Sequence, residues 1–188
     1  MRVLSIAAVA MLMLGGSPGA QQVPGEPFPG YALECGYPII SAPTPNVSLA
    51  MVDASGKSLI VLDPRLETEV EQARRQFLIA HECAHHLMNH ATAKSRVKRS
   101  SSHQVIRDQE LSADCKAAEM LARKGQERTI RIMADRFYKA GLYSPGGGYP
   151  AGIQRSTIIL HCAKSGRAAR RKANERNDRF ASALPKRF

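Results

Sequence analysis

The sequence predicts an α+β fold in which a small antiparallel sheet is followed by a helical region. Three short runs with strand-like composition occupy residues 37–42, 47–53 and 58–63, and residues 54–57 have the composition of a hairpin turn. After residue 68 the apolar residues recur every three or four positions, which is typical of one face of a helix. This change of period is the main basis for the fold class.

Four helices are expected after the sheet. The first has one apolar face, and Thr68 with Glu71 matches a capping box at its start. The face consists of Val70, Ala73, Phe77, Ala80, Ala84 and Leu87. The other three helices are expected at 108–124, 127–140 and 151–164, with stops at Gly125, Gly141 and Ser165–Gly166.

The N-terminus has the pattern of a secretory signal peptide over residues 1–20. Arg2 precedes an apolar run, and small residues follow it up to a cleavage point expected near Ala20. We interpret 21–32 as a flexible leader, 33–166 as the domain and 167–188 as a basic tail without assigned structure. The mature chain has no run long enough to span a membrane, so the expected location is secreted or periplasmic.

Export changes the interpretation of the four cysteines, Cys35, Cys83, Cys115 and Cys162. An oxidising compartment favours two disulfides, for which three connectivities exist. We favour Cys83–Cys115 and Cys35–Cys162, because the first pair would join the two helices with ligand motifs described below. The direction of Cys83, about 200° around the helix from His81, argues against that pair.

The charge is strongly positive and unevenly spread. The formal net charge is +11, and nine Lys or Arg residues stand against two acidic residues in 164–188. Such a segment can contact an anionic surface, although a solvated charged tail has the same composition. The sequence leaves the oligomeric state open.

The motif with the clearest chemistry is His81-Glu82-Cys83-Ala84-His85, on the first expected helix. Four residues advance a helix by about 400°, so both imidazoles lie on one face and can bind one Zn²⁺. Glu82 lies about 100° away and can take a proton from a water bound to the metal.

A second pair, Glu110 and Asp114, has the same spacing on the next expected helix. A catalytic zinc needs a third protein ligand and an open position for water, and Glu110 can be that ligand. Asp114 can accept the free N–H of a zinc-bound imidazole. His103 is a competing third ligand, whereas His86 and His90 are expected to be structural or exposed.

The HExxH motif followed by Glu110-Leu111-Ser112-Ala113-Asp114 resembles the gluzincin metallopeptidases. It is most similar to the family of the CAAX prenyl proteases and the HtpX-type membrane proteases, here in a small secreted form. The resemblance covers roughly residues 77–161 and implies a zincin-like fold, one catalytic zinc, and peptide hydrolysis with Glu82 as general base. A metzincin would need Gly and His where this chain has Met88 and Ala91.

The same family often has a late His-Pro…Arg element, which residues 148–155 resemble with Tyr149 in place of His. The resemblance implies that Arg155 and Tyr149 stabilise the oxyanion of the reaction. An ion-paired helix residue is the alternative for Arg155.

The expected function is therefore a zinc metalloendopeptidase that acts on a protein or peptide substrate. The alternative is a non-enzymatic exported protein that binds anionic membrane or nucleic acid through its basic segments. The intact Glu82 favours the enzyme, because a scaffold needs no general base.

Overall fold

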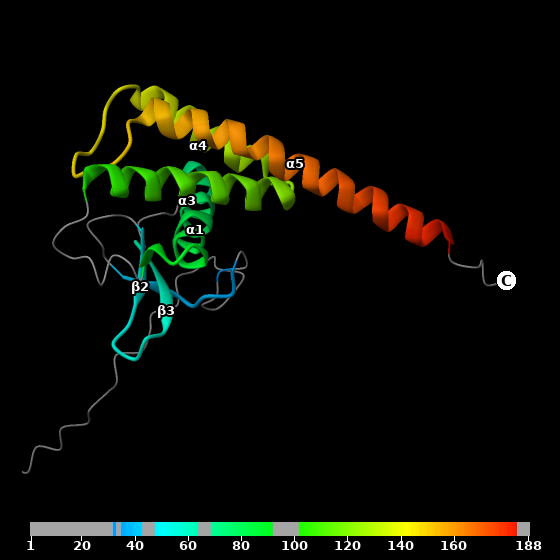
Figure 1. Cartoon of the computed structure of the whole chain (residues 1–188), viewed down its shortest axis with the longest axis horizontal. Coiled ribbons are helices and arrows are strands. Elements are labelled where there is room, and N and C mark those ends of the chain that lie inside the picture. Colours follow the sequence, from blue (N-terminus) through cyan, green and yellow to red (C-terminus); the bar gives the residue numbers. More distant parts are fainter. Residues whose placement is uncertain (1–31, 33–34, 43–47, 64–68, 92–101, 184–188) are drawn as a thin grey trace, which may run out of the picture.

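The computed structural model describes residues 32, 35–42, 48–63, 69–91 and 102–183, and they form a mixed α/β fold that is mostly helical (Figure 1). The predicted signal peptide, nearly all of the predicted leader and Thr68 of the expected capping box lie outside these residues. The described strands are β1 (Ile39–Ser41), β2 (Ser48–Val52) and β3 (Ser58–Leu62), and the described helices are α1 (Glu69–Leu87), α3 (His103–Arg123), α4 (Glu127–Ala140) and α5 (Gly152–Ala183).

The sheet is mixed, and the prediction of an antiparallel sheet was wrong for one strand. The order is β1-β3-β2, with β2 antiparallel and β1 parallel to the central strand β3. The turn after β2 explains the antiparallel pair, because the Asp53 carboxylate accepts hydrogen bonds from the amides of Ser55 and Lys57, each at 2.9 Å. β1 instead occupies the far edge of β3, so β2 is left as the other edge strand.

The central strand explains how the sheet joins the helices. β3 is an almost continuous apolar run, Ser-Leu-Ile-Val-Leu, and its last four residues are buried. Such runs are typical of strands covered on both faces. α1 packs against β2 and β3, which places the helix with the HExxH motif directly on the sheet.

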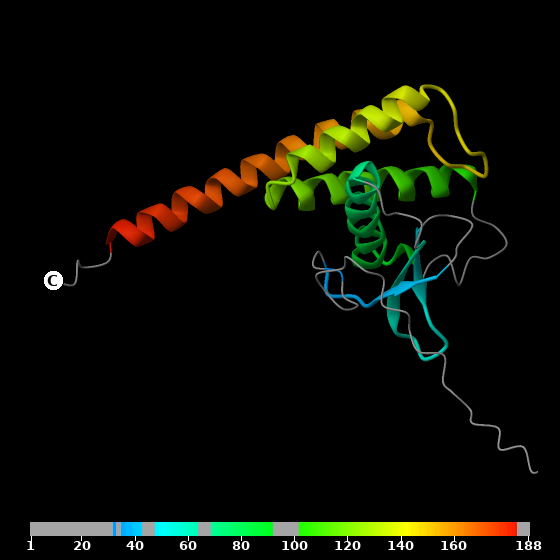
Figure 2. The same ribbon diagram turned by 180° about the vertical axis from the view of Figure 1, so that it is seen from behind.

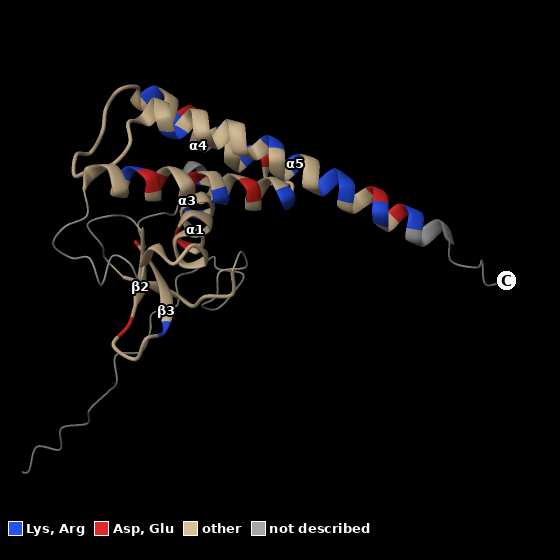
Figure 3. Ribbon diagram, viewed as in Figure 1, with Lys and Arg blue, Asp and Glu red and all other residues tan. Residues whose placement is uncertain are grey.

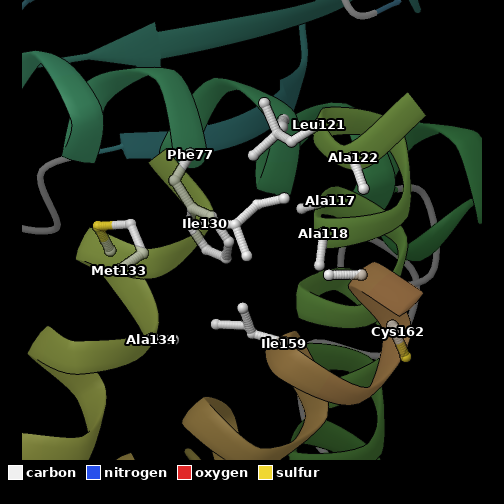
Figure 4. Close-up of a cluster of buried hydrophobic side chains, with 12 residues drawn as sticks. Phe77, Ala117, Ala118, Leu121, Ala122, Ile130, Met133, Ala134, Ile159 and Cys162 are labelled. Atoms are coloured by element: carbon white, nitrogen blue, oxygen red, sulfur yellow. The ribbon is translucent and has the colours of Figure 1, made fainter. Parts of the chain in front are cut away.

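The main hydrophobic core lies where α1 crosses the layer formed by α3, α4 and α5 (Figures 1 and 2). Figure 4 shows Phe77 from α1, Leu121 from α3 and Ile130 from α4 meeting in this core, and all three are fully buried. The remaining members are mostly alanine. Small side chains allow the helices to approach closely, which is how a chain with 5% aromatic residues builds a dense interior.

The last helix is longer than expected. We predicted that it stops at Ser165–Gly166, but α5 continues to Ala183 and extends beyond the other helices (Figure 2). Gly166 has a packing role instead, because a Cβ added to it would lie 2.5 Å from the Glu119 carbonyl oxygen and 2.7 Å from the Ala122 Cβ. The glycine that we interpreted as a stop signal is a point of close approach between α3 and α5.

The disulfide pairing that we favoured was also wrong. The bonds are Cys35–Cys83 and Cys115–Cys162, and no cysteine is free. The helical direction of Cys83 is the physical reason, since this side chain points away from α3 and toward the segment before β1. One bond therefore ties the N-terminal segment to α1, and the other ties α3 to α5.

The close approach at Gly166 gives a first prediction. Gly166→Ala should lower the free energy of unfolding by about 1–2 kcal/mol, because the clash with α3 outweighs the roughly 1 kcal/mol gained in helix propensity. The exposed neighbour provides the control, and Ser165→Ala should be neutral or slightly stabilising. Chemical denaturation of both variants measures the difference. A Gly166→Ala protein as stable as Ser165→Ala would contradict the packing described here.

Candidate metal centre

Two histidines of α1 converge within the protein. His81 and His85 are both buried, and their Nε2 atoms lie 3.0 Å apart. Their rings meet edge to face with centroids 4.7 Å apart. The spacing of four residues on one helix therefore directs both imidazoles at one point.

The third member comes from α3, which crosses α1. One carboxylate oxygen of Glu110 lies 3.1 Å from His81 Nε2, and the other lies 3.5 Å from His85 Nε2. The three residues form a buried group whose ligand atoms lie within 4.8 Å of one another, the only such group among the residues that the structure describes. His103 is not a member, since it lies exposed at the start of α3.

The spacing of these atoms suits a metal ion. Ligand atoms at about 2.0–2.1 Å from a tetrahedral zinc lie about 3.3–3.4 Å from one another, and the measured separations are 3.0, 3.1 and 3.5 Å. Two imidazole nitrogens and a carboxylate are also a ligand type that zinc accepts. The group can therefore hold a metal ion, with room in its coordination for a further ligand.

Asp114 stands behind His81, one helical turn after Glu110. Its Oδ1 lies 3.0 Å from His81 Nδ1, a close ion-pair contact whose angle departs from that of a straight hydrogen bond. The guanidinium of Arg155 donates to both oxygens of Asp114 at 2.7 Å and stacks on Phe137, 4.0 Å from the ring centroid. α5 thereby fixes the carboxylate that faces Nδ1 of the His81 imidazole.

Arg155 thus lies beside the site, but two of its donor groups are already used by Asp114. The role predicted for it at an oxyanion stays a prediction. Its alternative, an ion-paired helix residue, agrees with the observed contacts. The sequence pattern singled out this residue but did not indicate which carboxylate it binds.

The contacts among His81, Glu110 and Asp114 largely determine the pKa values of the group. Burial alone would lower the pKa of His81, but Asp114 and Glu110 outweigh it and raise that pKa to about 10. Burial lowers the pKa of His85. Burial would raise the pKa of Glu110, yet its hydrogen bonds with His81 and His85 hold that pKa well below its usual range. Between the protein groups alone, His81 therefore carries a proton at neutral pH.

Glu82 lies on the sheet side of the site. It is buried, its Oε1 accepts a hydrogen bond from Ser48 Oγ at 2.8 Å, and its Oε2 accepts from the Ala50 amide at 2.7 Å. Sequence reasoning missed both donors. For Ser48 the available signal was the alternation in β2, which places its side chain on the face that Ile60 and Leu62 of β3 share. The Ala50 donor is a backbone amide, which side-chain alternation does not indicate.

Tyr149 approaches the site from the loop between α4 and α5. It is half-buried, and its pKa is raised by burial and by the negative charges of Glu110 and Glu82. The loop is anchored by Gly148, whose φ is +90° and where a Cβ would lie 2.7 Å from the His103 carbonyl oxygen. A close contact that only glycine permits therefore holds this loop against the start of α3.

His86 of α1 and His90, which follows that helix, have contacts of other kinds. His86 is buried, and its Nε2 donates to the Leu59 carbonyl oxygen at 2.9 Å, which joins the helix to β3. His90 Nδ1 lies 3.1 Å from His85 Nδ1. Asn89, with φ of +59°, turns the chain after α1 and brings His90 back toward the site. Neither residue belongs to the group that can hold a metal.

Comparison of the chain with protein-family models finds no match, and none is found among curated proteins or solved structures. None of the described helices combines the length and apolar character needed to cross a membrane.

Protonated His81 gives a prediction for metal uptake. Zinc binds only an unprotonated imidazole, so binding near neutral pH should release the His81 proton, whose pKa of about 10 keeps it in place beforehand. Titration calorimetry in buffers of different ionisation enthalpy measures this release.

Asp114→Asn should reduce both the proton release and the zinc affinity, the latter about 10–100-fold. The matched control is Asp108→Asn, which changes an exposed carboxylate of the same helix that is bonded to Gln104 at 2.8 Å. Equal affinity and equal proton release in the two variants would contradict the role given to Asp114.

Proposed function

We propose that this protein is a zinc-dependent metallopeptidase with a zincin-like active site, of the gluzincin type that its motifs resemble. The observation that carries the proposal is the convergence of His81, His85 and Glu110 on one point, with Glu82 on the same helix beside them. Two imidazoles, one carboxylate and an open position are the composition of a catalytic zinc site. The two disulfides are compatible with an oxidising compartment and support the expected export.

The chemistry divides among a few residues. His81, His85 and Glu110 would hold a zinc ion, which would supply a more acidic bound water and polarise the scissile carbonyl. Glu82 takes the proton as the water attacks and passes it to the leaving amine. Tyr149 keeps its hydroxyl proton, because its pKa is raised, and we assign it as the donor for the oxyanion because two donor groups of Arg155 are bonded to Asp114. Arg155 holds Asp114, which orients His81.

The outer edge of β2 is an argument for a polypeptide substrate. The Asp53 amide donates to the Lys57 carbonyl oxygen at the hairpin end. In an antiparallel ladder, hydrogen-bonded and non-hydrogen-bonded pairs alternate, so Met51 and Leu49 are the β2 residues whose backbone groups bond to β3. The backbone groups of Ser48, Ala50 and Val52 then point away from β3, and no other described strand pairs with that edge. The Ala50 N–H is already bonded to Glu82 Oε2, so an extended peptide that adds along this edge would bond to the Ser48 and Val52 groups, next to Glu82.

The alternative function, a non-enzymatic protein that binds anionic membrane or nucleic acid, rests on the basic end of α5. Lys and Arg residues are distributed along that helix toward its projecting end, and the acidic residues Glu175 and Asp178 lie among them (Figure 3). Binding to anionic vesicles or DNA that falls steeply with salt, without zinc-dependent hydrolysis, would favour this alternative.

The proposed function is tested by Glu82→Gln. The amide can still accept from the Ala50 N–H and donate to Ser48, so fold and zinc content should be retained. It cannot take a proton from water, so peptide cleavage should fall roughly 10²–10⁴-fold. The assay compares wild type and variant, each with one zinc per chain, with and without chelator. Cleavage by the variant at the wild-type rate would assign the activity to another site.

A further inference from the structure

The two hydrogen bonds that Glu82 accepts both come from one strand. Ser48 and Ala50 are two residues apart in β2, which is itself paired with β3 along its whole length. β3, the other strand of this pair, is buried from Leu59 to Leu62. The carboxylate is thus attached to the sheet as well as to its own helix.

We propose that β2 positions the general base, with Ser48 as the positioning residue that fixes the carboxylate plane of Glu82. This inference rests on the proposed function. A carboxylate has about four lone-pair sites, two on each oxygen. Ser48 Oγ and the Ala50 amide occupy one site on each oxygen, at 2.8 and 2.7 Å. One site on each oxygen remains for a water and its proton.

A single donor would leave the carboxylate free to turn about its last bond. Two donors from one strand, one on each oxygen, fix both its rotation and its reach. The burial of the two side chains supports this, since Ser48 and Glu82 are each only 7% exposed and bulk water does not compete freely for the bond between them. A base held in this way meets the attacking water without first reorganising.

A purely structural role is the competing explanation, because any buried carboxylate needs donors. The two explanations differ in what Ser48→Ala changes. If Ser48 only satisfies a buried charge, the variant loses stability and its kcat per folded, zinc-loaded molecule is unchanged. If Ser48 positions the base, kcat falls while KM and zinc content are kept.

The experiment measures kcat and KM on a peptide substrate for zinc-loaded wild type, Ser48→Ala, Ser48→Thr, Glu82→Gln and the double variant Ser48→Ala/Glu82→Gln. We expect Ser48→Ala to lower kcat about tenfold, as a misplaced catalytic group does, with little change in KM. Ser48→Thr keeps the hydroxyl and should recover most of that loss. In the Glu82→Gln background, Ser48→Ala should have no further effect on kcat.

The matched control is Ser58→Ala, which makes the same change at the other end of the ladder, opposite Val52. It should leave kcat at the wild-type value. Wild-type kcat in Ser48→Ala, or an equal loss in both Glu82 backgrounds, would overturn the positioning role while leaving the proposed function intact. A zinc-loaded wild type that cleaves no peptide would instead overturn the proposed function, and the positioning role with it.

Discussion

The structure depends on the crossing of α1 and α3. Each helix presents a pair of functional residues four positions apart, and the crossing turns these pairs toward each other, so that Glu110 meets both histidines and Asp114 stands behind His81. A buried cluster of this kind is stable only if every charge has a partner. The contacts of Glu110 with two imidazoles and of Asp114 with His81 and Arg155 provide those partners.

The rest of the fold holds that crossing in place. Alanines of α3 permit a close approach to α1 and α5, and Gly166 permits a backbone contact between α5 and α3 that a Cβ would block. The disulfides act at two positions next to the site, because Cys83 lies within the HExxH motif and Cys115 follows Asp114 directly. Each bond joins a ligand-bearing helix to a different neighbour, so neither constrains the distance between the two helices directly.

Local spacing was enough to predict the members of the site. The periods of four in His81/His85 and Glu110/Asp114 depend only on helix geometry, which is why these residues were identified before any tertiary contact was known. The long-range features were not accessible in the same way. Three such features depend on how separate elements pack together. They are the parallel pairing of β1, the disulfide between Cys35 and Cys83, and the hydrogen bond from Ser48 to Glu82. The prediction that the last helix stops at Gly166 was wrong for a related reason. A glycine that ends a helix and a glycine that lets a neighbouring helix pack closely look alike in sequence.

We propose that one metal ion binds between α1 and α3 through two imidazoles and one carboxylate. X-ray absorption at the zinc edge, on protein loaded with one zinc per chain, tests this ligand set. We expect two nitrogen ligands from imidazole and the remainder oxygen, at about 2.0–2.1 Å, and loss of this signal in Glu110→Ala but not in His103→Ala. A sulfur shell near about 2.3 Å, or an unchanged spectrum in Glu110→Ala, would contradict it.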